Sequence, residues 1–180
     1  MGGINRAISS YKSVGESRKA NGIKCIFLSH QQNDKVLCKK IAEYLIAADI
    51  DVYFDEYDND LKIHRQTNNP HGVVESIKKG INESSHMLVL VSPNTINSSW
   101  VPWEIGYDKT SLYVLTLKGI PDYNLPDYLK TTNIIRGTKT LNEFLANITN
   151  SSTLQLEGRN LIKSFNAFNN PLNDYLDGYK

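Results

Sequence analysis

The strongest constraint on the fold is a run of apolar residues without a polar interruption, which recurs between amphipathic segments. Met87-Leu88-Val89-Leu90-Val91 is the clearest example, and Cys25-Ile26-Phe27-Leu28 is a shorter run of the same kind. Such a run predicts a strand that is buried on both faces, which is typical of a parallel sheet covered by helices.

Amphipathic helices are predicted between these runs. The segment that ends near residue 48 places an apolar face at spacings of three and four, formed by Leu37, Ile41, Tyr44, Leu45 and Ala48. A second helix is predicted from Pro70, with Asn69 as its cap, and its stripe consists of Val73, Val74, Ile77, Ile81 and Ser84. Shorter helices are predicted at 100–107 and 141–149.

Five strands are predicted, at 24–29, 51–55, 87–92, 112–117 and 133–135, with a polar loop between the second strand and Pro70. Strands that alternate with helices form parallel sheets with right-handed crossovers. We therefore expect an α/β fold, namely a flavodoxin-like five-stranded parallel sheet of order 2-1-3-4-5 with helices on both faces.

A chain of 180 residues fits one main domain, here 23–150, with an extension of 1–22 before it and one of 151–180 after it. Each extension is predicted to be helical, and the second to dock on the domain or on another subunit. In the first extension, the apolar residues at helical spacing are Ile4, Ala7, Ile8 and Tyr11. In the second extension they are Leu161, Ile162, Phe165 and Phe168. A further short stripe in the second extension consists of Leu172, Tyr175, Leu176 and Tyr179.

Composition excludes several classes of function. With 20 basic and 19 acidic residues the net charge is +1, which argues against a nucleic-acid partner. The sequence has neither a membrane-length apolar run nor the apolar core of a signal peptide, so we expect a cytoplasmic protein without a membrane partner. The motifs of phosphate-binding loops are absent, and the four histidines lack metal-ligand spacing, so we expect no metal site.

In a parallel sheet, ligands bind beyond the carboxyl ends of the strands. Here those ends carry Ser29-His30-Gln31, Asp55-Glu56 and Ser92-Pro93-Asn94. Glu75 is expected near the same edge because the helix that follows the second strand begins there, and it lies off that helix's apolar stripe. Trp100 and Glu104 are four residues apart and so share one helix face.

Each of these residues also has a purely structural interpretation. Glu75 could complement a helix dipole, Trp100 could pack in the core, and Glu104 could be an ordinary exposed helix charge. His30 and Ser29 could be polar loop residues. Residue types alone leave both interpretations open.

Three blocks of sequence, in this order, resemble a Toll/interleukin-1 receptor (TIR) domain over about residues 23–150. They are Cys25-Ile26-Phe27-Leu28-Ser29-His30, then Asp51-Val52-Tyr53-Phe54-Asp55 with Glu75-Ser76-Ile77, and finally Leu88-Val89-Leu90-Val91-Ser92-Pro93-Asn94 with Ser99-Trp100-Val101-Pro102-Trp103-Glu104. The chain resembles the stand-alone bacterial TIR proteins of Thoeris-type antiphage defence.

This resemblance implies an NAD-consuming enzyme that cleaves the nicotinamide–ribose bond, with NAD as substrate and no cofactor. It implies that Glu75 is catalytic and that Trp100 lines the pocket. From their place at the strand ends, Ser29, His30, Gln31 and Asp55 are expected to contact the substrate, although His30 and Gln31 depart from the aromatic or basic pair of some family members. The product would be an ADP-ribose-type nucleotide, linear or cyclic, that signals to a separate effector. The family resemblance also implies self-association.

Three other interpretations remain. A non-catalytic TIR adaptor would need no carboxylate at Glu75. A response-regulator receiver is disfavoured because Ser92-Pro93 stands where its phosphoacceptor Asp belongs. A nucleoside deoxyribosyltransferase-like enzyme has the same topology and a Glu nucleophile, and is a minor alternative.

Overall fold

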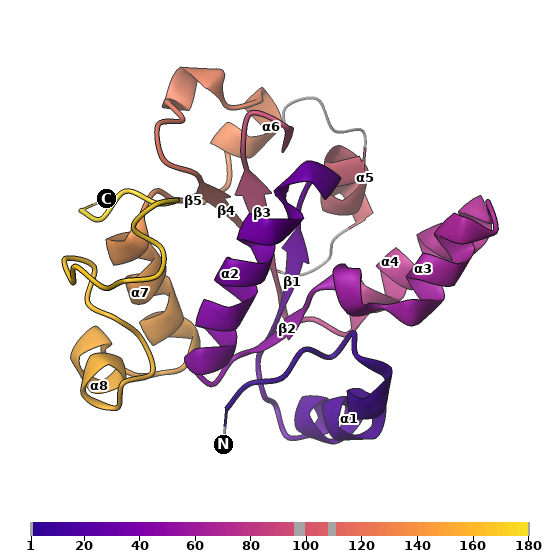
Figure 1. The fold of residues 1–180 in the computed structure, drawn as a ribbon, viewed down its shortest axis with the longest axis horizontal. Helices are drawn as coiled ribbons and strands as arrows, with labels where there is room; N and C mark the ends of the chain where they lie inside the picture. Colours follow the sequence, from indigo (N-terminus) through magenta and orange to yellow (C-terminus); the bar gives the residue numbers. More distant parts are fainter. Residues whose placement is uncertain (1, 96–99, 108–110, 180) are drawn as a thin grey trace.

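The central feature of the fold is a five-stranded parallel sheet of order β2-β1-β3-β4-β5 (Figure 1). The computed structural model describes residues 2–95, 100–107 and 111–179, except for the side chains of Trp100 and Asp122. The strands are β1 (Cys25–Ser29), β2 (Asp51–Tyr53), β3 (His86–Val91), β4 (Ser111–Thr116) and β5 (Asn133–Ile135). The predicted fold class and strand order are confirmed.

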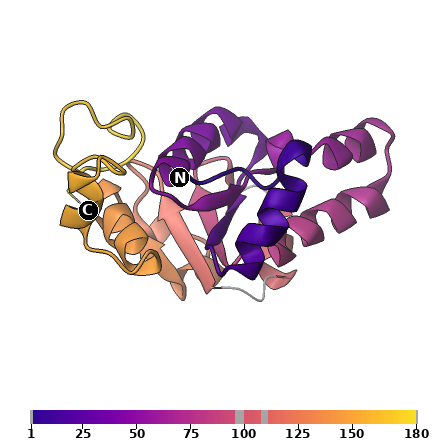
Figure 2. The same cartoon turned by 90° about the horizontal axis from the view of Figure 1, so that it is seen from below.

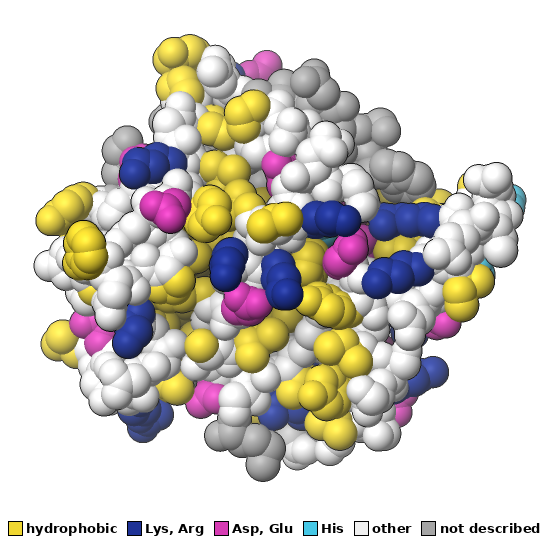
Figure 3. Space-filling model, in the orientation of Figure 1, with side chains coloured by type: hydrophobic (Ala, Val, Ile, Leu, Met, Phe, Trp, Pro, Cys, Tyr) yellow, Lys and Arg dark blue, Asp and Glu magenta, His cyan; other side chains and the backbone are white. Residues whose placement is uncertain are grey.

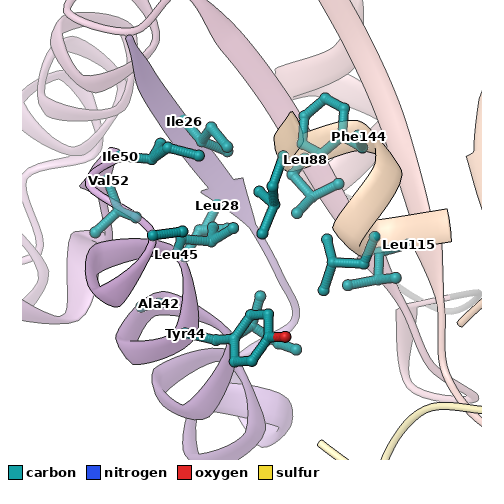
Figure 4. Close-up of a cluster of buried hydrophobic side chains, with 14 of the residues drawn as sticks. Ile26, Leu28, Ala42, Tyr44, Leu45, Ile50, Val52, Leu88, Leu115 and Phe144 are labelled. Atoms are coloured by element: carbon teal, nitrogen blue, oxygen red, sulfur yellow. The ribbon is translucent and has the colours of Figure 1, made fainter. Parts of the chain in front are cut away.

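Helices cover both faces of the sheet because successive strand residues point to opposite sides. On β1, Ile26 and Leu28 pack with the helices of one face, whereas Cys25 and Phe27 pack with those of the other. The first face is covered by α2 (Lys35–Ala47) and α7 (Thr138–Ile148), and the second by α4 (Pro70–Asn82), α5 (Trp100–Tyr107) and α6 (Asp127–Lys130). Figure 4 shows the first of these two cores, where Leu45 of α2 and Phe144 of α7 meet the sheet.

The α4 helix begins as predicted. Pro70 is its first residue, and the Asn69 side chain accepts a hydrogen bond from the amide of Gly72 at 3.0 Å. Such a cap satisfies one of the amide groups that the first turn of a helix leaves without a backbone partner.

The polar loop predicted before α4 contains a helix, α3 (Asn59–Gln66). Asp58 caps α3 by accepting a hydrogen bond from the amide of Leu61. Leu61 is the buried residue of this helix, so the sequence carries no apolar stripe that would have predicted it. Together α3 and α4 form a helical hairpin that projects away from the sheet (Figures 1 and 2).

The N-terminal extension is placed differently from the prediction. Residues 4–6 are extended and run beside β2, where the amide of Arg6 donates to the carbonyl of Val52 and the amide of Val52 donates to that of Ile4. The helix of this extension, α1 (Lys12–Ala20), comes later, so the predicted helix through Ile4 is wrong. Hydrogen bonds to the edge of β2 explain the extended path, because they occupy backbone groups that a helix would use internally.

The C-terminal extension contains α8 (Thr153–Gly158), and residues 159–179 then follow turns and bends. The helix predicted over 161–168 is therefore wrong. Side-chain hydrogen bonds to the backbone explain the irregular path, because Asn170 donates to the carbonyl groups of Lys163 and Ser164. The segment packs on the core through Ile162, Leu172 and Leu176, while Phe168 is fully exposed.

The remaining short elements are 3-10 turns at Ser9–Tyr11, Gln32–Asp34, Asp55–Tyr57 and Asp122–Asn124. Asp55 thus opens a turn directly after β2, at the carboxyl edge of the sheet.

Candidate functional site

A cavity of about 220 Å³ lies at the carboxyl edge of the sheet, where the sequence predicts ligand binding. His30 and Gln31 follow β1 in its wall, Asp55 follows β2, Ile77 comes from α4, and Glu104 comes from α5. The cavity therefore combines an apolar side with two carboxyl groups, an arrangement typical of small-molecule sites.

Glu104 is the buried acid of this cavity. Only 7% of its surface is exposed, and the Ser29 hydroxyl donates a hydrogen bond to its Oε2 at 2.5 Å. Because Ser29 is the last residue of β1, this bond joins α5 to the carboxyl end of that strand. The interpretation of Glu104 as an ordinary exposed helix charge is wrong.

Burial raises the pKa of Glu104 to about 8, since a carboxylate loses its hydration inside the protein. The negative charge of Asp55 adds to this rise, whereas the Ser29 hydrogen bond and the Arg65 guanidinium act in the opposite direction. A carboxyl group with a pKa near neutrality is a marker of functional sites, because it can change charge during a reaction.

Asp55 lies between two basic side chains at the mouth of the cavity. Its Oδ1 is 3.9 Å from Nδ1 of His30, and its Oδ2 is 3.4 Å from Nη2 of Arg65. The His30 ring is fixed by an edge contact with Phe54, at 5.2 Å between ring centroids, and its Nδ1 lies 3.3 Å from the carbonyl oxygen of Leu28. The cavity thus offers hydrogen-bonding groups of both charges.

A second polar cluster supports the loop after β3. The Ser92 hydroxyl and the Asn94 amide both donate to the carboxylate of Asp34, and the amide of Ser92 donates to the Thr95 hydroxyl. Ser92, Asp34 and Thr95 are buried. Because the described polar atoms of this cluster bind one another, we assign it a structural role in shaping the loop.

The structure brings together His30, Gln31 and Asp55 in the cavity wall, with Ser29 bound to Glu104. Glu75 does not line this cavity, because its side chain is 71% exposed on α4 and forms an ion pair with Lys78 at 2.9 Å. The side chain of Trp100 lies outside the described residues.

Glu104 and Arg65 line the cavity but were not among the catalytic and substrate-binding residues expected from the sequence. Glu104 was part of the recognised block, and its position four residues after Trp100 was the available signal for a special role. Arg65 falls within the predicted loop, and nothing in the local pattern distinguished it.

The described ranges contain no group of three or more His, Cys, Asp and Glu side chains placed to hold a metal ion. None of the helices in these ranges has the length and apolar content needed to cross a membrane.

The fold and the cavity define an α/β domain with an acidic cavity at the carboxyl edge of a parallel sheet. The model of the family described as TIR domain matches residues 26–135, and the chain belongs to this family. The match spans the sheet from β1 to β5 and includes α3, α4 and α5. The family includes NAD-cleaving enzymes and interaction domains. No curated protein matches the chain.

Proposed function

We propose that this protein cleaves NAD at the nicotinamide–ribose bond and that Glu104 is its catalytic carboxylate. The observation that supports this most directly is the buried Glu104 side chain in the cavity, bound by Ser29 and with a pKa raised to about 8. Glu75 has the residue type that the reaction needs, but its position on the exposed side of α4 favours Glu104 instead.

The proposed reaction places a positive charge next to Glu104. Cleavage releases neutral nicotinamide and leaves an oxocarbenium-like centre on the ribose, as in glycoside hydrolysis. An ionised Glu104 stabilises this cation, and the low-polarity surroundings that raise its pKa also strengthen the attraction. The positively charged pyridinium ring of NAD favours the ionised form of Glu104 when substrate binds.

The other groups of the cavity would position the ribose. The Ser29 hydroxyl holds one oxygen of Glu104 in place, while Asp55 and His30 can exchange hydrogen bonds with ribose hydroxyl groups. Attack by water gives ADP-ribose, and attack by a nucleophile of the same nucleotide gives a cyclic product. We propose this nucleotide as the signal to a separate effector in antiphage defence, and self-association of the protein as part of activation.

The test is nicotinamide release from NAD by Glu104→Gln, which keeps the size of the side chain and removes its charge. Loss of one electrostatic stabiliser of a transition state lowers the rate by about 10²–10³. The control is Glu43→Gln, an identical change at an exposed surface ion pair of α2, which should keep the parent rate. Nicotinamide release by Glu104→Gln at the parent rate would show that Glu104 is not the catalytic group.

The pH profile gives a second readout of the same proposal. If the ionised carboxylate acts, kcat/KM rises with pH up to about 8, because this parameter reports the free enzyme. The corresponding rise of kcat with pH should occur at lower pH, because the pyridinium cation of bound NAD stabilises the Glu104 carboxylate.

An adaptor function is the second candidate, and the α3–α4 hairpin is the observation that favours it. This hairpin projects from the domain (Figure 1). It exposes the apolar side chains of Tyr57, at its base, and Ile63. If the parent releases no nicotinamide under any condition of concentration or activation, the adaptor function becomes the better proposal.

A further inference from the structure

A second cavity, of about 320 Å³, lies in the notch between α3 and α4. Its wall includes His64 and Arg65 near the end of α3, Asn68 and Asn69 in the connection, and Pro70 and Val73 at the start of α4. Because this notch belongs to the projecting hairpin, it extends the site outward from the sheet (Figures 1 and 2).

The two cavities are neighbours, and Arg65 lines both of them. On α4, Ile77 lines the Glu104 cavity and Val73 lines the notch. Residues four apart lie one turn from each other on the same helix face. The two cavities therefore follow one another along α4, with Arg65 at their junction.

Arg65 has the chemistry of a phosphate-binding group. Its side chain is 42% exposed, and its one described partner is Asp55 at 3.4 Å, which is longer than a tight charge-assisted bond. A guanidinium has five donors arranged to bind phosphate oxygens in pairs, so Arg65 can bind an anion and keep Asp55 beside it. Figure 3 shows Lys and Arg side chains gathered on the surface between α2 and α3.

The notch itself suits a flat aromatic ring. Pro70 and Val73 provide apolar surface, and the His64 ring is held by the Asn69 amide at 3.3 Å from its Nδ1. The amide groups of Asn68 and Asn69 can exchange hydrogen bonds with ring nitrogens and hydroxyl groups. Apolar surface combined with a few polar groups is the usual composition of a small-molecule site, and a nucleoside has groups that match both.

We infer that Arg65 binds the pyrophosphate of a dinucleotide and that the α3–α4 notch binds its adenosine half, an inference that rests on the proposed function. The order of groups along α4 then matches the order in NAD. The nicotinamide riboside lies at Glu104, the pyrophosphate at Arg65, and the adenosine between His64 and Val73. The notch makes the site selective for a dinucleotide over a shorter substrate with the same scissile bond.

The test compares NAD with nicotinamide riboside, which lacks both phosphates and adenosine. Arg65→Gln should lower kcat/KM for NAD at least tenfold more than it lowers kcat/KM for nicotinamide riboside, and the extra loss should come mainly from KM. Lys62→Gln is the matched control, because it removes the same charge from an exposed position of α3 that lines neither cavity. His64→Ala should likewise lower kcat/KM for NAD only.

Equal losses for both substrates in Arg65→Gln, or no loss for either, would overturn the inference. A second measurement separates it from the proposed function. ADP-ribose binding, measured by calorimetry on the parent, Arg65→Gln and Lys62→Gln, requires no turnover. If the parent proves inactive but binds ADP-ribose, and Arg65→Gln alone weakens this binding tenfold, the inference stands and the proposed activity fails. If ADP-ribose binds none of the three proteins, or binds all three equally, the inference fails.

Discussion

Asp51 and Glu104 are both buried acidic side chains of this domain, and their surroundings are opposite. Asp51 is fully buried at the start of β2, where Nε of Arg6 lies 2.8 Å from one carboxylate oxygen and Nη2 of Arg18 lies 2.7 Å from the other. Its Oδ1 also accepts the amide of Ile4 at 3.0 Å. Glu104 faces a cavity and accepts a hydrogen bond from a neutral hydroxyl, that of Ser29.

The difference shows how burial of a charge can serve two purposes. The oxygens of Asp51 are occupied by partners from the N-terminal extension, so this acid ties residues 4–18 to the edge of the sheet. Removing such a group leaves buried charges without compensation, which is costly for folding. Glu104 is not neutralised in this way, and its raised pKa is the cost of leaving a carboxyl group available to a ligand.

The largest effect on stability is expected at the first of these acids. Asp51→Asn removes the negative charge between Arg6 and Arg18 and should lower the free energy of unfolding by about 3–5 kcal/mol. Chemical denaturation measures this change. The comparison variant is Asp127→Asn, which breaks an exposed pair with Lys130 and should leave the midpoint unchanged. Equal midpoints for Asp51→Asn and the parent would show that the extension contributes nothing to stability through this ion cluster.

Glu104 should make the protein less stable as pH rises, whereas most carboxylates make a protein less stable as pH falls. The pKa of Glu104 is about 8 in the folded protein and near 4.5 when unfolded, so between these values the folded state binds the extra proton. Stability contributed by the protonated form is therefore present below pH 4.5 and is lost as pH rises to 8, by on the order of 4 kcal/mol. The free energy of unfolding is measured against pH for the parent and for Glu104→Gln. The difference between the two curves isolates this contribution. If the difference in unfolding free energy between parent and Glu104→Gln does not change over pH 4.5–8, Glu104 is not a buried acid with a raised pKa.

The sequence was sufficient to predict the sheet, because β1 and β3 contain continuous apolar runs and α2 and α4 have apolar stripes. The cap of α4 at Asn69 was also predictable, since its chemistry is local. The two extensions were predicted less well. Their apolar residues have helical spacing, but long-range partners such as Asp51 for Arg6 override that preference.

The candidate site was predictable in its position but not in all of its members. Strand ends identify His30, Gln31 and Asp55, because the carboxyl ends of parallel strands meet at one edge. The burial of Glu104 depends on how α5 packs against Ser29, a contact between residues 75 positions apart, so helix periodicity alone could not reveal it. The cavity wall formed by Arg65 depends on α3, whose single buried residue leaves no periodic signal.

The smallest effect is expected at Glu75, the acid that the family resemblance marks as catalytic. Its side chain is largely exposed and pairs with Lys78 on the surface of α4, so Glu75→Gln should keep the parent's melting temperature and rate of nicotinamide release. Assaying Glu75→Gln beside Glu104→Gln decides between the two acids. A loss of about 10²–10³ in Glu75→Gln, with Glu104→Gln near the parent rate, would assign catalysis to Glu75. Glu104 would then be a structural acid like Asp51, and the α4 surface would have to form the substrate site.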